Sequence, residues 1–304
     1  MLRYATRRVA QGAFVVVGVL FVVFFVTRVI GDPVALMLPL EATAEQRAAL
    51  RDSLGFSAPL YQQFVTFLGD AVRGDLGNSL RHNIPALPLV LGRLPATAYL
   101  AAVTMLIAIP TAILLGAIAA FKPGSFLDRI INGLSLGGVS VVDFWFGLML
   151  ILIFGVTLGW LPSGGYGTAQ HVILPALALA LRPIGRLSQL TRSAMVEEYA
   201  KPYIKMARAK GMPEHRVFFH ALKNASIPII TLAGDDIADL AGGTVVIEFV
   251  FAWPGLGLLL LQSIGNRDIM LVQATALVIA VLVVLVNLVV DLTYAYLDPK
   301  IRYA

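Results

Sequence analysis

Residues 197 to 231 read Glu-Glu-Tyr-Ala-Lys-Pro-Tyr-Ile-Lys-Met-Ala-Arg-Ala-Lys-Gly-Met-Pro-Glu-His-Arg-Val-Phe-Phe-His-Ala-Leu-Lys-Asn-Ala-Ser-Ile-Pro-Ile-Ile-Thr, and long apolar runs flank them. Pro202 suits the first turn of a helix, where its missing N–H is not needed. Gly211 suits the left-handed position after a helix end, and Pro213 can open another helix. The pattern predicts a short helix from Pro202 to about Lys210, a break, and a helix from Pro213 to about Lys223. A helix as short as the first is marginal in water, so we expect it to pack against a partner.

The composition of the chain around this stretch is that of a membrane protein. Of its 304 residues 58% are hydrophobic and 13% are charged, with a mean hydropathy of +0.83. Soluble proteins have about 25% charged residues. Cysteine is absent, which excludes disulfides and thiolate metal sites. The net charge of +5 does not indicate nucleic-acid binding, because the basic residues cluster between apolar segments.

Six apolar stretches are candidates for transmembrane helices, since about 20 residues cross a bilayer. The first has too long an apolar core for a signal peptide and no small-residue cleavage site, so we expect it to be retained. The fourth is less apolar, and we expect Pro175 and Pro183 to break it. The expected spans are Val9–Ile30, Ala96–Phe121, Gly133–Trp160, His171–Leu190, Ile227–Phe251 and Ala274–Leu297. We expect one transmembrane domain over residues 1–304.

A more polar insertion, at about residues 32–95, separates the first two spans. Thr43 and Gln46 have the spacing of a capping box, and Gly55 is a plausible end of that helix. An apolar stripe at helical spacing follows from Leu60 to Val72. We expect this stripe to pack against the outer ends of the membrane helices.

The distribution of Lys and Arg predicts the orientation. The N-terminus, second loop and C-terminus carry 3, 2 and 2 of these residues, and the stretch Arg182–Lys223 around the fourth loop carries 9, whereas the third loop carries none and the fifth only Arg267. The insertion carries five, but a segment of that length crosses largely regardless of charge. Both termini should therefore be cytoplasmic, together with the fourth loop at about residues 191–225, and the insertion should be extracytoplasmic.

Several motifs resemble one family of transporters. Met206 to Gly211, followed by His220 and Asn224-Ala-x-x-Pro228, is similar to the cytoplasmic loop of permeases in the dipeptide/oligopeptide/nickel branch of ABC importers. Of the general importer motif Glu-Ala-Ala-x-x-x-Gly, only Ala207 and Gly211 agree; Lys205 and Met206 occupy its first two positions. Further pieces of the chain that resemble the family are Gly31–Pro33, Arg73–Arg81, Arg93–Thr97 and Asp291–Lys300.

The resemblance implies an all-α integral membrane fold, with six transmembrane helices and both termini cytoplasmic, in a bacterial inner or plasma membrane. The chain would form half of the translocation path of an ATP-driven importer for a small peptide or related solute. The implied partners are a second homologous permease, two ATP-binding subunits, an extracytoplasmic substrate-binding protein and membrane lipid, without nucleic acid. No Gly-x-x-x-x-Gly-Lys-Ser/Thr loop occurs in the sequence, so ATP and Mg are expected on the partner subunits. We expect no catalytic residue, metal or cofactor in this chain.

The fourth loop would then contain a coupling helix that docks on an ATP-hydrolysing subunit. The alternative is a solvated basic loop that merely obeys the positive-inside rule. That alternative accounts for the charges but not for the Ala/Gly pattern or the Pro–Gly–Pro punctuation. The expected coupling residues are Tyr203, Ala207, Arg208, Ala209, Lys210 and Gly211.

Acidic residues inside the expected spans are candidates for a translocation path. A charged residue at the centre of a membrane helix costs about 2.5–3.5 kcal/mol and almost always faces a cavity or a partner. Asp235 and Asp239 are four residues apart and Asp236 and Asp239 three apart, so we expect all three on one face. With Asp143, they would make a negative patch that favours a cationic or zwitterionic solute. The alternative is internal pairing, for which the spans offer few bases beyond Arg182 and Arg186.

A further candidate site is the Trp-Pro-Gly-Leu-Gly segment after the fifth span. We expect Trp253, Pro254, Gly255 and Gly257 to make a tight re-entrant turn at the outer mouth. The alternative is a plain loop anchored by a Trp at the membrane interface.

Two other classes of function stay open at the level of sequence. A proton-coupled secondary transporter would use the intramembrane Asp cluster as a relay, and its transport would survive ATP depletion but not an uncoupler. A membrane-embedded enzyme or scaffold is the other, but the four His residues are scattered and no nucleophile, metal set or cofactor motif is evident. The sequence does not identify the solute, since peptides, nickel chelates, glutathione-like compounds and oligosaccharides all fit by analogy.

The orientation is testable by cysteine labelling, since the chain has no cysteine of its own. Cysteines introduced at Ser57 and Gly165 should react with an impermeant thiol reagent added outside intact cells. A cysteine at Lys210 should react only after the membrane is opened. Labelling of Lys210→Cys from outside would overturn the predicted orientation.

Overall fold

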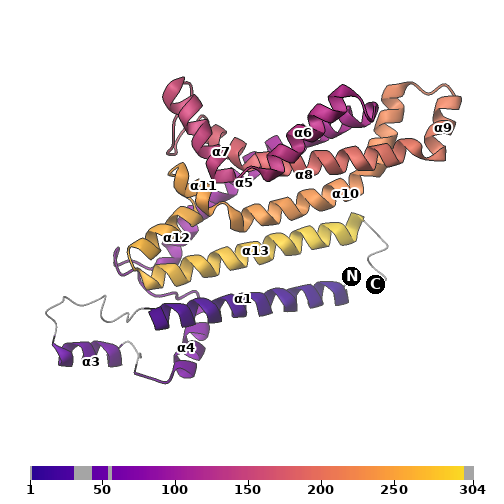
Figure 1. The fold of residues 1–304 in the computed structure, drawn as a ribbon. Coiled ribbons are helices and arrows are strands. Elements are labelled where there is room, and N and C mark those ends of the chain that lie inside the picture. The colour runs from indigo at the N-terminus through magenta and orange to yellow at the C-terminus, as the bar shows by residue number, and fades with distance from the viewer. Residues whose placement is uncertain (1, 31–42, 54–56, 298–304) are drawn as a thin grey trace.

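The computed structural model describes residues 2–30, 43–53 and 57–297, and the fold is all-α (Figure 1). The elements are α1 (Leu2–Ile30), α3 (Ala44–Ser53), α4 (Leu60–Val72), α5 (Ala86–Phe121), α6 (Phe126–Ser140), α7 (Asp143–Leu150), the π-helix η1 (Ile151–Thr157), α8 (Ile173–Ala200), α9 (Pro202–Ala209), α10 (Glu214–Gly243), α11 (Val245–Val250), α12 (Leu256–Gly265) and α13 (Ile269–Leu297). Figure 1 shows the start of α1, the end of α13 and α9 toward one end of the bundle, with α3 and α12 toward the other.

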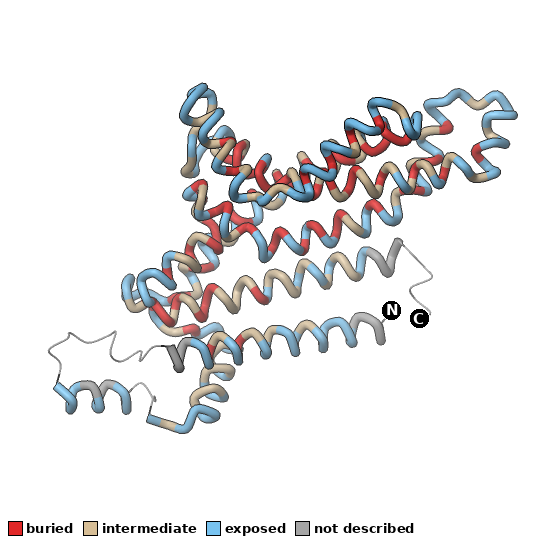
Figure 2. Tube along the Cα trace, in the orientation of Figure 1, coloured by how far each residue is buried: buried red, intermediate tan, exposed pale blue. Residues whose placement is uncertain are grey.

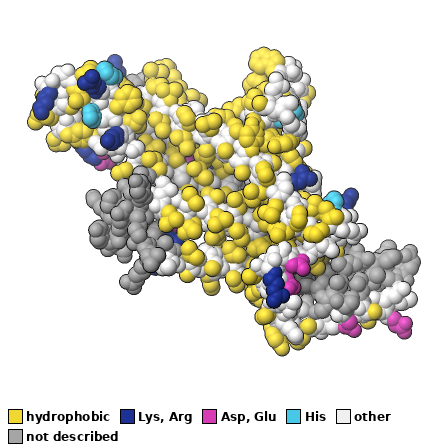
Figure 3. Space-filling view, turned by 180° about the vertical axis from the view of Figure 1, so that it is seen from behind, with side chains coloured by type: hydrophobic (Ala, Val, Ile, Leu, Met, Phe, Trp, Pro, Cys, Tyr) yellow, Lys and Arg dark blue, Asp and Glu magenta, His cyan; other side chains and the backbone are white. Residues whose placement is uncertain are grey.

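Four helices of the described chain are long and apolar enough to cross a membrane. They are α1, α5, α10 and α13, and the bent pair formed by α6 with α7 and η1 makes a fifth if it is one span. Figure 3 shows hydrophobic side chains over most of the middle of one face, with Lys, Arg and His gathered at the end formed by α9. The protein is a multi-pass membrane protein, and the count of six spans stays a prediction.

Several helices run past prolines, among them Pro183, which was expected to break its helix. α5 starts at Ala86, ten residues before the predicted start of the second span, and continues through Pro95 and Pro110. α8 continues through Pro183. α10 continues through Pro228, so the helix predicted after Pro213 and the fifth span are one element as far as Gly243. Membrane helices tolerate proline because neighbouring helices and side chains satisfy the freed carbonyls.

The third predicted span is not straight. The chain bends by 104° between α6 and the α7–η1 segment. Val141 and Val142 between them have extended backbone, with ψ of 135° and 126°. Asp143, predicted inside a continuous span, therefore stands at the first residue of α7.

α8 is the central helix of the bundle, and buried positions recur along it (Figure 2). Glycines bring it into contact with its neighbours. A Cβ at Gly116 of α5 would lie 2.5 Å from the Ser188 carbonyl oxygen, and a Cβ at Gly185 of α8 would lie 2.5 Å from the Ser135 carbonyl oxygen of α6. The hydroxyls of Ser135 and Ser188 are hydrogen-bonded at 2.6 Å. Small residues at such contacts are the usual means of close helix packing in membranes.

The N-terminal elements lie at the edge of the bundle. Only 11% of the apolar window of α1 is buried within the chain. The stripe on α4 packs on α1 as expected, with the Phe24 and Phe64 rings 5.3 Å apart and the Phe24 and Phe67 rings 5.8 Å apart. The predicted capping box is confirmed, since the Thr43 N–H donates to Gln46 Oε1 at 3.0 Å and the Gln46 N–H to Thr43 Oγ1 at 3.2 Å. Gly31–Pro33, Gly55 and Asp298–Lys300 lie outside the described residues.

The close packing of α5 on α8 gives a stability prediction. Gly116→Ala should destabilise the protein by about 1–3 kcal/mol, because its methyl group has no room against Ser188 and Thr191. Gly92→Ala is the matched control on the same helix, since nothing lies within 4 Å of a Cβ there. Thermal unfolding in detergent should show a lower melting temperature for Gly116→Ala alone. Equal melting temperatures for the two variants would contradict the packing.

Candidate functional site

The 191–225 loop is built on a buried core. Gly211 has a φ of +74° and ends α9 in the left-handed conformation, as predicted. Ile204 of α9 is fully buried and belongs to a cluster with Leu187 of α8 and Val217 and Ala221 of α10. This short helix thus packs against the two long helices beside it.

A polar network around Glu198 fixes α9 to the ends of α8 and α10. Lys201 Nζ lies 2.5 Å from Glu198 Oε1, and the Tyr203 hydroxyl donates to Glu198 Oε2 at 2.6 Å. Asn224 Nδ2 in turn donates to the Tyr203 hydroxyl at 2.8 Å. Burial alone would raise the pKa of Glu198, but the hydrogen bonds from Lys201 and Tyr203 outweigh burial and hold the pKa of this carboxyl below its ordinary 4.5.

A second polar contact closes the turn between α9 and α10. The Arg208 guanidinium donates twice to the Glu214 carboxylate, at 2.9 and 3.1 Å, and lies 5.7 Å from the centre of the Tyr199 ring. Ala207 is half-buried and packs against the Ile204 cluster. Met206, Ala209 and Lys210 are exposed, and Met206 is 59% exposed.

The intramembrane acids do not form the single negative face that was predicted. Asp236 is 3% exposed and its Oδ1 lies 2.7 Å from Arg186 Nη1, whereas Asp239 Oδ2 lies 3.6 Å from the same nitrogen. Both line a cavity of about 100 Å³ that also contains Asp143, and Asp235 does not line it. Neighbouring residues of a helix point about 100° apart, so Asp235 and Asp236 diverge. The internal pairing left open by the sequence is realised for Asp236.

The Trp-Pro-Gly-Leu-Gly segment joins α11 to α12 and is held from inside. Trp253 is buried, not interfacial, and its indole N–H donates to the Ala96 carbonyl at 2.9 Å. The buried Glu248 carboxylate accepts from the N–H groups of Gly257 at 2.7 Å and Leu258 at 3.1 Å. It also accepts from the hydroxyls of Thr97 at 2.7 Å and Thr244 at 3.0 Å.

The glycines of this segment make room for that carboxylate. A Cβ at Gly255 would lie 2.3 Å from Glu248 Oε1, and one at Gly257 would lie 3.0 Å from Glu248 Oε2. Pro254 precedes the pair and stands before the first residue of α12. The segment is therefore a buried helix–helix turn, not a plain loop.

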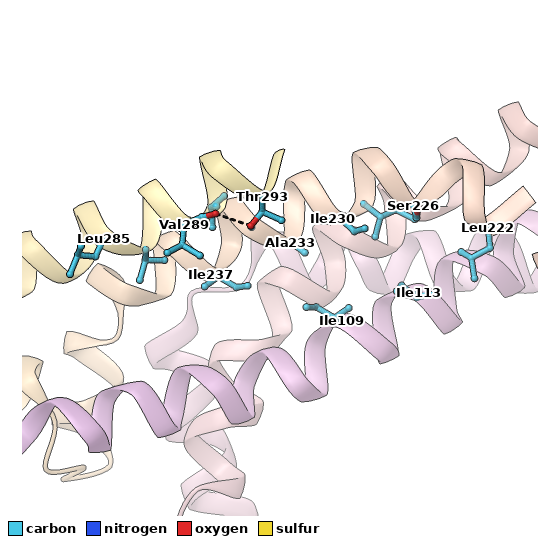
Figure 4. A pocket seen from close by; sticks show the side chains of 14 residues that line it. Ile109, Ile113, Leu222, Ser226, Ile230, Ala233, Ile237, Leu285, Val289 and Thr293 are labelled. Carbon is cyan, nitrogen blue, oxygen red and sulfur yellow. Dashed lines mark hydrogen bonds between the residues drawn. The ribbon is translucent and has the colours of Figure 1, made fainter. Parts of the chain in front are cut away.

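A larger cavity, of about 680 Å³, lies between α5, α10 and α13 (Figure 4). Aliphatic side chains such as Ile109, Ile230 and Val289 point into it. Its two hydroxyls are already used, since Ser226 donates to the Lys223 carbonyl at 2.7 Å and Thr293 to the Val289 carbonyl at 2.8 Å. The lining has no charged side chain, so it offers nothing that would orient a polar solute.

Comparison with known proteins identifies the family. Residues 112–303 match the family described as binding-protein-dependent transport system inner membrane component, and residues 1–101 match the N-terminal model of such membrane components. The chain belongs to this family. The permease is 38% identical to the oligopeptide transport system permease protein AppB of Bacillus subtilis (strain 168), over all of both chains.

Two further relatives are also named as permease proteins of peptide transport systems. The permease is 36% identical to the di/tripeptide transport system permease protein DppB of Pseudomonas aeruginosa (strain UCBPP-PA14), over 100% of this chain and 99% of the relative. It is 38% identical to the probable peptide ABC transporter permease protein y4tP of Sinorhizobium fredii (strain NBRC 101917 / NGR234), over 99% of each. The permease is thus a membrane-embedded subunit of an ABC importer and not an enzyme. The predicted family resemblance is confirmed.

Sequence reasoning missed several charged residues that hold this permease together. Arg192 of α8 makes two contacts with the buried Asp128 of α6, at 2.5 and 2.7 Å. Asp268, before α13, accepts from the Ser79 hydroxyl at 2.5 Å and the Leu80 N–H at 3.2 Å. Glu198 carried a weak signal in its i,i+3 spacing to Lys201; the others join positions far apart in the chain. In the described part of the permease, no three His, Asp or Glu side chains come together as a metal site.

The network around Glu198 predicts a pH dependence. Because its folded pKa is lowered, Glu198 contributes stability above its unfolded pKa, and this contribution is lost as the pH falls through the folded value. Glu198→Gln should therefore melt below the parent at pH 7, and the difference should shrink once the pH is well below 4.5. Glu197→Gln, a neighbour that is 77% exposed, is the control and should match the parent at both pH values. A Glu198→Gln difference that persists unchanged in acid would contradict the role of the charge.

Proposed function

We propose that this permease couples ATP hydrolysis on separate subunits to the import of small peptides, using α9 as the docking element. The observation that carries the proposal is the division of α9 into two faces. Ile204 and Ala207 pack inward against α8 and α10, whereas Met206, Ala209 and Lys210 are exposed to solvent. An exposed Met beside two small or basic residues suits an adaptable protein contact.

The surroundings of α9 support its use as a rigid transmitter. Glu198, Tyr203 and Asn224 connect the end of α8, α9 and α10 in one hydrogen-bonded chain. Arg208 and Glu214 brace the turn on its other side. A displacement of α9 is therefore passed on to both long helices. A merely solvated basic loop would instead absorb such a displacement.

The proposed cycle follows from this arrangement and from the family. ATP, with Mg, binds to two partner subunits and brings them together, and α9 follows the subunit on which it is docked. α8 and α10 then move with α9 and open or close the path that this permease forms with a second, homologous permease. A substrate-binding protein outside the membrane delivers the solute. Peptides are the proposed solute class because the relatives' names specify oligopeptides and di/tripeptides.

A proton-coupled transporter is the less well supported hypothesis for the function of this chain. The cluster of three acids on which it depended is divided, since Arg186 contacts Asp236 and Asp239 and leaves Asp235 outside the cavity. Uptake that stops on ATP depletion and survives an uncoupler is the expected result.

The docking face can be tested by placing a charge on it. Met206→Glu should reduce both peptide uptake and the amount of ATP-binding subunit that co-purifies with the tagged permease by about tenfold or more, the scale of a central interface residue. The fold should persist because the Met206 side chain is exposed. Val72→Glu, at an 89% exposed position on α4, adds the same charge elsewhere and should keep the ATP-binding subunits bound. Full co-purification and uptake with Met206→Glu would place the docking surface elsewhere.

A further inference from the structure

The small cavity beside Asp236 gathers charged side chains of both signs from three helices. Asp143 comes from α7, Arg182 and Arg186 from α8, and Asp236 and Asp239 from α10. The 104° bend before α7 brings Asp143 to this place. Three carboxylates face two guanidiniums in a space of about 100 Å³, so the cavity is amphoteric and not simply acidic.

Two carboxylate oxygens in this cavity are buried without a hydrogen-bond partner. One is Asp236 Oδ2, on a side chain that is 3% exposed and whose other oxygen binds Arg186. The other is Asp143 Oδ1. A buried acceptor that lacks a donor costs free energy, and the cost is larger when the group is charged. Unpaired acceptors of this kind on two different helices indicate that a donor from outside the chain completes the site.

Arg182 supplies the opposite kind of group. Within the described ranges, the side chains of Arg182 and Asp143 make no hydrogen bond or salt bridge, although both line the cavity and their charges attract each other. A guanidinium has five N–H donors in a fixed plane and suits a carboxylate. Arg186, by contrast, is already bound to Asp236 and Asp239 and serves to hold the acids in place.

We propose that the cavity between α7, α8 and α10 is a binding site for a zwitterion, with a solute ammonium group at Asp143 and Asp236 and a solute carboxylate at Arg182. The inference rests on the proposed function, in that a peptide in transit is the zwitterion concerned. It differs from the predicted patch, which was purely negative, because Arg182 and Arg186 offset two of the three acids. It also excludes Asp235, which lies on the same helix but outside the cavity.

The test uses the purified, nucleotide-free transporter complex without its binding protein, so that selection by that protein does not interfere. Melting temperatures are measured in increasing concentrations of L-alanyl-L-alanine, its amide, its N-acetyl derivative and the doubly blocked, uncharged form. Ligand that binds only the folded complex raises the melting temperature. The unmodified dipeptide should bind best, each singly blocked form about tenfold or more weaker, and the uncharged form least.

Variants assign the effect to the cavity. Asp143→Asn and Arg182→Gln should each lower the affinity for the dipeptide about tenfold or more. Both should fold, because neither side chain makes a hydrogen bond or salt bridge within the described structure, only a charge attraction to the other and, for Arg182, to Asp236. Asp143→Asn should make the affinities for the dipeptide and its N-acetyl form equal. Arg182→Gln should make the affinities for the dipeptide and its amide equal. Asp235→Asn is the matched control on α10 and should leave the affinity unchanged.

The outcomes separate this site from the proposed function. The complex could import peptides although its melting temperature shows no rise that depends on the ligand's charges, or a rise that survives both Asp143→Asn and Arg182→Gln. Either result would overturn the site and leave the import function standing. A dipeptide amide that binds more tightly than the dipeptide, or an equal loss with Asp235→Asn, would restore the acidic patch and overturn the site. A shift that follows the predicted pattern in a complex that imports no peptide would retain the site and overturn the proposed solute.

Discussion

The structure depends on the contact of backbone with backbone where α8 passes α5 and α6. At Gly116 and Gly185 a single methyl group would collide with a facing carbonyl oxygen. This proximity leaves no room for α8 to rotate or slide without moving its neighbours. Four charged residues of α8 take their places from that constraint: Arg182 and Arg186 at the cavity, Arg192 against α6, and Glu198 at the base of α9.

The same helix joins the two regions for which we propose a role in transport, the cavity and the 191–225 loop. Arg186 and Glu198 are twelve residues apart, which corresponds to about 18 Å along an α-helix. At one end the helix is bound to α10 through Asp236, and at the other through Tyr203 and Asn224. α8 and α10 are thus connected at both the cavity and the loop, which makes the pair a natural lever between them.

Much of the fold could be predicted from local sequence, because its signals are local. The Pro202 and Gly211 positions fixed the limits of α9, and the Thr43 and Gln46 spacing marked the start of α3. Proline was misjudged at position 183, since the rule that it ends helices holds in water and fails where neighbouring helices surround the chain. The bend before Asp143 had no signal stronger than two adjacent valines.

The charges of the site could be predicted only in part, because pairing across helices is a property of tertiary packing. Asp236 with Arg186, and Asp128 with Arg192, join residues 50 and 64 positions apart. From sequence alone the acids of α10 formed one patch; in space the adjacent Asp235 and Asp236 point to different surroundings. Glu248, an acid inside the fifth predicted span, ends as the buried acceptor that holds the turn after Trp253.

The polarity of α8 has a consequence for how this protein is made. An Arg at the centre of a membrane helix adds about 2.5–3.5 kcal/mol to the free energy of insertion. α8 is not among the helices apolar enough to enter the bilayer by themselves, yet it is the most central one. Its acidic partners lie on α6, which is synthesised before it, and on α10, which is synthesised after it. The charges of α8 therefore have all of these partners only once α10 has been synthesised, which favours insertion of these helices as a group over insertion one at a time.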